Sequence, residues 1–421
     1  MKTITSKRTA YFSFPKTNAF WMPILGTLVE YYDYALYGFT AVLISQLYFP
    51  AVDPTASLLK TYVVFALGSI AKPIGSLIFG WIGDHMGRKI ALQWSMLGIF
   101  IPTTLIGVLP TYQEWGISAT IILIFCRLFQ GIFLSGETEG ARIYLYESFL
   151  KDRPTLINCI VGISCYLGIF LASYAVSLVP LSVETNTWRI PFLIGGALGG
   201  VIFIIRRFLN ESTDYLAYQL QSKNSKASTK ISKKAFLGTI LLCGGVGGLY
   251  QLFFVFLGSY LSNVTGFFTA IQIQAFTPIM LLVHIISLLG AAWLADYFSP
   301  KKVISWGLIL TIPLICLLGY QLFSNCVRLE LFLAISVSYA LITTPGFNLI
   351  IASVGVGKRY RFVSLGHALG SVLFSGCAPA VSLFLWQQTH LSFAPVIHAL
   401  ALCICVHGGV ILLCQPREKD V

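Results

Sequence analysis

The sequence has few charged residues. Only 10% of its 421 residues are Asp, Glu, Lys or Arg, while 56% are hydrophobic; a soluble domain usually carries about a quarter charged residues. The apolar residues form runs of about 20, long enough to cross the roughly 30 Å hydrocarbon core of a bilayer. These properties exclude a soluble globular protein and indicate a polytopic helical membrane protein.

Several kinds of site are also missing. The ten cysteines show no metal-ligand spacing and mostly lie within apolar runs, so we expect neither a disulfide framework nor a metal site. No nucleophile–base constellation indicates an enzyme, and no cofactor or catalytic residue is expected. The first apolar run starts near Phe20 and passes Tyr37 without a small-residue cleavage site, which predicts the absence of a cleavable signal peptide.

The net charge of +12 is unevenly distributed. Of the 28 Lys and Arg residues, 22 fall in the two tails and in loops on one predicted side of the membrane. This bias follows the positive-inside rule and argues against nucleic-acid binding. We therefore expect both termini in the cytoplasm and a lipid bilayer around the chain.

Hydropathy predicts an all-α membrane protein with twelve transmembrane helices. They divide into two pseudo-symmetric six-helix bundles, 19–207 and 235–414, with a linker at 208–234 and tails at 1–18 and 415–421. The stretch from Arg206 through the linker is rich in Lys and is expected to be solvated. The predicted spans are 19–48, 57–82, 90–110, 117–145, 155–180, 188–207, 235–261, 270–294, 302–323, 329–353, 363–387 and 393–414.

A charged turn after the second span is repeated in the second half. Gly80–Lys89 reads GWIGDHMGRK, and a degenerate copy, AWLADYFSPK, occupies Ala292–Lys301. Asp84 and Asp296 hold the same place in the two copies, 212 positions apart, which is about half the chain. This duplication suggests two related bundles that move against each other, as in a transporter.

The residue types in this turn favour a gating role. Gly80 and Gly87 would permit close helix approach and a sharp turn. Asp84 could stabilise the positive end of a neighbouring helix, and Arg88 could pair with a carboxylate. The predicted gating residues are Gly80, Asp84, Gly87, Arg88 and Asp296.

Ionisable residues within the spans are concentrated in the first half. A charge at the bilayer centre costs about 2.5–3.5 kcal/mol on insertion scales, so these side chains should face the protein interior or a wet cavity. Asp33, Lys72 and Arg127 are predicted at a similar depth near the midplane. They could bind protons and an anionic solute, or they could form fixed ion pairs. The predicted solute and proton-coupling residues are Glu30, Asp33, Tyr34, Tyr37, Lys72, Arg127 and Glu137.

Other polar residues in the spans leave alternatives open. Glu137 and Glu139 lie two positions apart and face different partners on a helix. At least one of them is expected to pair with Arg142. In the second half, His284 and His367 are either packed, hydrogen-bonded residues or members of a proton relay.

Several stretches resemble a known family. Gly80–Lys89 and Arg127–Gly131 are similar to the loop and fourth-helix signatures of the major facilitator superfamily. Glu30–Gly38 (EYYDYALYG), Lys72–Gly75 (KPIG) and Ser135–Ala141 (SGETEGA) resemble its metabolite:proton symporter family. The resemblance covers nearly the whole chain. In that family Arg is usual where Lys72 stands and Gly where Glu139 stands, so the identity of the solute does not carry over.

The resemblance implies proton-driven uptake of a small organic solute by alternating access across a bacterial inner membrane. The family includes carriers for proline and betaine, 2-oxoglutarate, citrate and shikimate. Because Lys72 and Arg127 are positive, we expect a carboxylate solute, such as a dicarboxylate. We also expect a monomeric protein. A symporter for a zwitterionic osmolyte or amino acid and a solute exchanger are alternatives; a non-transporting membrane sensor is a more remote one.

Overall fold

The computed structural model describes residues 18–50, 54–149, 153–178, 186–222 and 232–414. Within these ranges the chain is almost entirely helical and contains no strand. Short turns connect long antiparallel helices, as the alternation of apolar runs and polar turns in the sequence predicts. The structure therefore has the predicted all-helical class.

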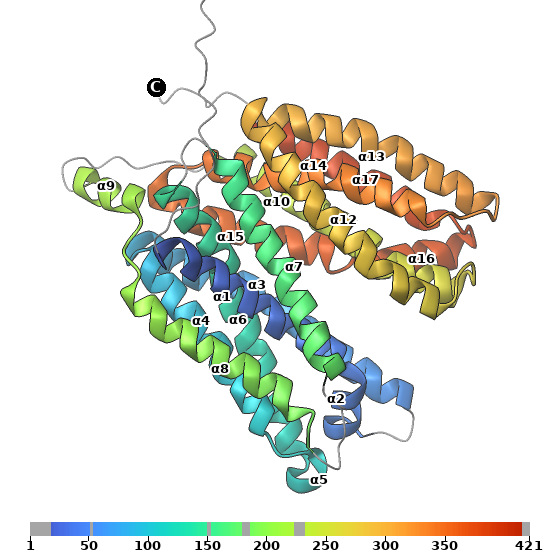
Figure 1. The fold of residues 1–421 in the computed structure, drawn as a ribbon, viewed down its shortest axis with the longest axis horizontal. Helices are drawn as coiled ribbons and strands as arrows, with labels where there is room; N and C mark the ends of the chain where they lie inside the picture. The colour runs from blue at the N-terminus through green and yellow to red at the C-terminus, as the bar shows by residue number, and fades with distance from the viewer. Residues whose placement is uncertain (1–17, 51–53, 150–152, 179–185, 223–231, 415–421) are drawn as a thin grey trace, which may run out of the picture.

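The helices of residues 18–208 form the first half of the molecule, drawn from blue to green in Figure 1. Its longer helices are tied together by the packing of α1 on α7, α3 on α6, and α4 on both α6 and α8. The elements are α1 (Asn18–Phe39), α2 (Ala41–Tyr48), α3 (Pro54–His85), α4 (Arg88–Val108), α5 (Tyr112–Trp115), α6 (Ile117–Ser148), α7 (Pro154–Leu178) and α8 (Arg189–Ile205), with a 3-10 turn at Arg206–Phe208.

A short helix, α9 (Thr213–Ser222), precedes the second half. In that half α10 packs on α17, and α14 packs on both α12 and α13. Two of the predicted spans are interrupted by π-helical turns. The elements are α10 (Lys233–Tyr250), a π-helical stretch (Gln251–Phe256), α11 (Leu257–Ser259), a second π-helical stretch (Tyr260–Val264), α12 (Ala270–Tyr297), α13 (Pro300–Phe323), α14 (Glu330–Ala352), a 3-10 turn (Val356–Lys358), α15 (Arg359–Gly370), a third π-helical stretch (Ser371–Ser375), α16 (Ala378–Thr389) and α17 (Ala394–Leu413).

Ten helical segments of the described residues are long and apolar enough to cross a membrane. Helices α1 and α3, which correspond to the first two predicted spans, are not among the ten. Both carry ionisable residues in their interior, Glu30 and Asp33 in α1 and Lys72 in α3. Because a charge inside a membrane is costly, these side chains have to face the protein interior and not the lipid.

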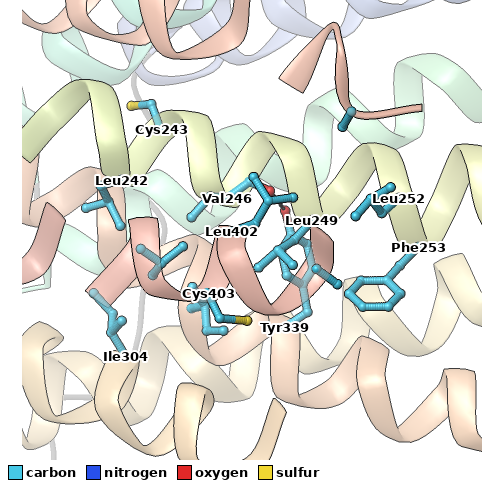
Figure 2. Packing of buried hydrophobic residues seen from close by; sticks show 14 of the residues in the cluster. Leu242, Cys243, Val246, Leu249, Leu252, Phe253, Ile304, Tyr339, Leu402 and Cys403 are labelled. Atoms are coloured by element: carbon cyan, nitrogen blue, oxygen red, sulfur yellow. Dashed lines mark hydrogen bonds between the residues drawn. The ribbon is translucent and has the colours of Figure 1, made fainter. Parts of the chain in front are cut away.

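The second half has a continuous apolar core, part of which is drawn in Figure 2. Leu242, Leu249 and Leu402 are each at most 1% exposed and come from α10 and α17. Tyr339 of α14 extends into this core, and its hydroxyl donates a hydrogen bond of 2.8 Å to the Val246 carbonyl. The bond satisfies the only polar group of the Tyr339 side chain and fixes the position of its ring.

The two halves meet through a small number of helices. Helix α15 of the second half packs on α3 and α6 of the first, and α7 of the first packs on α12 and α14 of the second (Figure 1). Both contacts include the end of the molecule where α3 turns into α4. We call this end the clamp end, because the polar contacts between the halves described below lie there.

Candidate functional site

Asp33 is the centre of a buried polar cluster between α1, α4 and α6. Its side chain is 2% exposed. The Thr103 hydroxyl donates a 2.7 Å hydrogen bond to Oδ1, and the Gln130 amide donates to both carboxylate oxygens, at 3.1 and 2.9 Å. Gln130 in turn accepts a 2.8 Å hydrogen bond from the Arg127 guanidinium. Gln130 therefore connects a buried carboxylate to a buried cation.

Tyrosines of α1 lie beside the two cations of this region. The Arg127 guanidinium carbon is 4.2 Å from the centroid of the Tyr37 ring, and Lys72 Nζ is 5.4 Å from that of Tyr34. Cation–π contacts of this kind hold a charge against a ring face without neutralising it. Asp33, Tyr34 and Arg127 also line one small cavity, together with Gly68, Gln130, Gly131 and Leu134. Five of the seven residues predicted for solute and proton coupling thus lie together.

Glu30 and Glu137, the other two predicted residues, have different partners, and like Tyr37 and Lys72 they do not line the cavity. Glu30 is 2% exposed and accepts a 2.5 Å hydrogen bond from the Thr138 hydroxyl. Glu137 is fully buried, forms an ion pair through both oxygens with Arg206, and accepts a 2.6 Å hydrogen bond from Ser95. The geometry of Glu137 thus matches the fixed ion pair that the sequence left open.

Two predictions about charged residues are wrong, one about the burial of Arg206 and one about the partner of Arg142. Arg206, expected at the start of a solvated stretch, is fully buried because it supplies the counter-charge of Glu137. In the part of the chain that the structure describes, no ion pair within 4 Å joins Arg142 to either glutamate, although its charge acts favourably on Glu139. Glu139 instead faces His367, with Oε1 and Nδ1 2.9 Å apart, and the Arg142 guanidinium lies 3.9 Å from the ring centroid of Phe347. Helix spacing places Arg142 near Glu139, but both side chains turn toward the second half.

The charged turn allows a close contact between the halves at the clamp end. α3 ends at His85, and Gly87 has a φ of +109°, a conformation that favours glycine, before α4 starts at Arg88. At Gly80, a Cβ atom would lie 2.6 Å from the Cα atom of Arg361. Any side chain there would collide with the backbone of α15, so the glycine permits the observed approach of α3 and α15.

The two repeated aspartates cap helices of the opposite half. Asp84 accepts hydrogen bonds from the backbone N–H groups of Tyr360 (3.0 Å) and Arg361 (3.1 Å), in the first turn of α15. Asp296 accepts them from Thr155 (2.9 Å) and Leu156 (3.0 Å), in the first turn of α7. A carboxylate at a helix N-terminus satisfies free donors and interacts favourably with the helix dipole. The sequence repeat is therefore also a structural repeat, with one cap in each direction across the interface.

A buried charge network reinforces the first of these caps. Arg88 binds both carboxylate oxygens of Glu147, each at 3.0 Å, and Arg359 of α15 binds Glu147 Oε1 at 2.8 Å. We name Asp84, Arg88, Glu147 and Arg359 the clamp network. The sequence interpretation expected a carboxylate partner for Arg88 but did not single out Glu147 or Arg359. Glu147 lies two residues beyond the predicted end of the fourth span, where a charge would ordinarily be solvated.

Residues before α9 complete the network. The Ser212 hydroxyl donates a 2.6 Å hydrogen bond to Glu147. Glu211 accepts hydrogen bonds from the backbone N–H groups of Arg88 (3.0 Å) and Lys89 (3.3 Å), at the start of α4. Burial raises the pKa of the Glu211 carboxyl, although these donors oppose the shift. The segment between the halves is thus attached to the clamp end by side-chain contacts.

Removing either cap should loosen one defined helix start. We expect Asp84→Ala to increase amide hydrogen exchange at Tyr360 and Arg361, and Asp296→Ala to increase it at Thr155 and Leu156. A helix N-cap contributes about 0.5–2 kcal/mol, which corresponds to an increase in exchange of about 2- to 30-fold. Hydrogen–deuterium exchange of both variants measures this, and in each variant the larger increase is expected at the helix start that has lost its own cap. An equal increase in exchange at all four amides in either variant would contradict the capping role.

Comparisons with known proteins place the chain among transporters. Residues 19–239, more than half of the chain, match the family described as "Sugar (and other) transporter". The shikimate transporter of Escherichia coli (strain K12) is 28% identical over 377 residues, covering 85% of each chain. The alpha-ketoglutarate permease of the same organism is 27% identical over 404 residues, covering 90% of this chain and 91% of the permease.

A solved structure shows the same fold. The proton:xylose symporter XylE of the major facilitator superfamily, bound to 6-bromo-6-deoxy-D-glucose, superposes with a TM-score of 0.74. The alignment covers 92% of this chain and 94% of that chain, at 13% sequence identity. The similar proteins named here are transporters, and none is an enzyme.

Proposed function

The chain belongs to the sugar (and other) transporter family of the major facilitator superfamily, and we propose that it is a proton-coupled symporter of a small organic carboxylate. In this proposal twelve spans form two bundles that rock about a central site. The clamp end and both termini face the cytoplasm of a bacterial cell, and the protein works as a monomer in the inner membrane. The positive-inside bias of the sequence supports this orientation.

The observation that carries the proposal is the connection of Asp33 to Arg127 through Gln130. While Asp33 is ionised, its negative charge balances the nearby guanidinium. A proton that arrives from the outer side and binds to a carboxylate oxygen removes this charge. Arg127 then requires a new counter-charge, which the anionic solute supplies, because a buried cation requires one. Lys72, which is attracted mainly to Glu30, adds further positive charge to this region. Solute binding is therefore favoured by protonation of Asp33.

Release follows the same electrostatics in reverse. When the halves separate at the clamp end, water reaches the site and the solute and the proton leave toward the cytoplasm. Ionised Asp33 can then balance Arg127 again, and the empty protein can return. Both related proteins described above carry, by name, the anion of an organic acid. Their solutes support a carboxylate here, as does the presence of two cations at one depth.

Uptake into proteoliposomes tests the proposal. With the membrane potential clamped at zero, a pH difference of one unit supplies about 1.4 kcal/mol per coupled proton, which supports about tenfold accumulation at equilibrium. We expect such accumulation, toward the alkaline interior, of at least one of succinate, 2-oxoglutarate, citrate and shikimate. A protonophore and protein-free liposomes are the controls. Equilibration without accumulation would contradict symport, and accumulation of only proline or betaine would contradict a carboxylate solute.

A further inference from the structure

His284 of α12 is fully buried among aromatic rings. Its ring centroid lies 5.2 Å from that of Tyr166, 5.0 Å from Phe254 and 5.3 Å from Tyr339. Tyr250 closes the group, with its centroid 6.1 Å from Tyr166 and 5.4 Å from Phe254. We name these five residues the His284 cage. Nothing in the coupling scheme above uses them.

The hydrogen bonding of His284 fixes what its free nitrogen can do. Nδ1 lies 3.1 Å from the Ser336 carbonyl, which can only accept, so Nδ1 carries the proton of the neutral ring. Among the described residues no carboxylate pairs with His284, and a neutral ring is the form suited to an apolar cage. Nε2 is then an acceptor, and it has no hydrogen-bond partner in the described part of the chain. A buried acceptor without a donor is costly in free energy, and a ligand can relieve that cost.

The cage lies between the two halves and beside the charged site. Tyr166 belongs to α7 of the first half, whereas the other four rings belong to the second. Tyr250 also lies near Tyr34, which lines the Asp33 cavity. Tyr166, Tyr250 and Phe254 are only half-buried. Movement of the halves would separate Tyr166 from the other rings and open the cage.

Local backbone geometry also sets this place apart. Phe254 lies in the π-helical stretch Gln251–Phe256, which starts directly after Tyr250. Such stretches are rare and occur frequently at functional sites. Tyr339 is held by its hydrogen bond to Val246, so one wall of the cage is rigid. The cage thus combines a fixed wall, a movable wall and one unused acceptor.

We propose that the His284 cage is the solute subsite of the second half and that it selects solutes with a hydroxyl group. This inference rests on the proposed transport function and narrows its substrate class to hydroxylated organic solutes. The carboxylate of the solute lies toward Arg127 and Lys72, and its hydroxyl donates a hydrogen bond to His284 Nε2. The aromatic rings of the cage pack against the carbon skeleton of the solute, which accounts for the number of rings around the single polar atom Nε2.

Matched solute pairs that differ by one hydroxyl test this selection by binding alone. The pairs are malate and succinate, citrate and tricarballylate, carnitine and γ-butyrobetaine, and hydroxyproline and proline. Binding to the purified full-length protein is measured by calorimetry. In the pair that binds, we expect the hydroxylated member to bind about tenfold more tightly, the usual effect of one hydrogen bond. In His284→Phe, which keeps an aromatic ring, this preference should disappear.

Two further variants separate a lost acceptor from a damaged fold. His284→Gln retains an acceptor oxygen and should preserve part of the preference. His398→Phe replaces another histidine of the second half, bonded to Ser382 at 2.9 Å, and should leave the preference unchanged. Equal binding within the pairs, a preference that survives in His284→Phe, or no binding by any of the eight solutes would overturn the proposal. Failure of proton coupling alone would leave the binding preference intact, so the two proposals fail separately.

Discussion

Asp33→Asn is expected to abolish proton-driven accumulation of the solute while leaving solute exchange across the membrane. Asparagine has nearly the same shape and keeps an oxygen that can accept from Thr103 or Gln130. Asparagine cannot gain or lose a proton, so the counter-charge of Arg127 no longer alternates between residue 33 and the solute. Under the one-unit pH gradient described above, accumulation should fall from about tenfold to about equal concentrations on both sides.

Two matched variants make this result specific. Glu30→Gln and Glu137→Gln neutralise the other buried carboxylates of the predicted set, and both should retain proton dependence. Glu30 is bonded to Thr138 and Glu137 is paired with Arg206, and neither lines the cavity with Arg127. Counterflow of labelled solute measures exchange in each variant. Accumulation by Asp33→Asn at the level of the unmodified protein would remove Asp33 from the coupling mechanism.

Glu147→Gln is expected to open the clamp end and to lower thermal stability by several degrees. The side chain of Glu147 is fully buried and balances two guanidinium groups, those of Arg88 and Arg359. Removing one member of a buried ion network costs about 3–5 kcal/mol, because the remaining charges lose their counter-charge. Arg359 belongs to the opposite half, so part of this cost is avoided when the halves separate. The ratio of closed to open molecules should fall about a hundredfold or more.

Hydrogen exchange at the start of α15 and a thermal unfolding curve measure the two effects. The rescue variant combines Glu147→Leu with Arg88→Met and Arg359→Met. It removes three of the four charges of the clamp network and leaves Asp84 with its two backbone donors. Apolar replacement of a buried ion network is often neutral or stabilising. We expect it to recover most of the thermal stability. Protection of the Tyr360 and Arg361 amides that is unchanged in Glu147→Gln would show that the network does not hold the halves together.

The sequence predicts the class of the fold and the broad location of the site. Apolar runs of membrane-spanning length identify the helical class, and the family expected from the short motifs is confirmed by the match over residues 19–239. Asp33 and Arg127 come together because charges within spans must face inward, and few interior positions are available at one depth. The roles assigned to these residues remain predictions.

Pairings between distant helices could not be predicted in the same way. Glu137 and Arg206 are 69 positions apart, and Glu147 and Arg359 are 212 apart. Helical periodicity indicates which face of a helix is buried, but the partner on that face depends on how complete helices pack. The same limit explains the error over Arg142, for which the sequence indicates only the neighbouring glutamates. π-Helical turns are also invisible to periodicity, because the spans that contain them are apolar on most faces and a rotation of the later residues leaves no visible break.

The two aspartate caps, one in each direction between the halves, make the closed state an all-or-none arrangement. Asp84 caps a helix of the second half, and Asp296 caps a helix of the first. Since each half is a packed unit, a single tilt of one half against the other breaks both caps together, and neither can be lost gradually. At about 1 kcal/mol each, two caps change the closed-to-open ratio only about 30-fold. The caps are thus the smaller contribution to the closed state, beside the larger one of the buried Glu147 network.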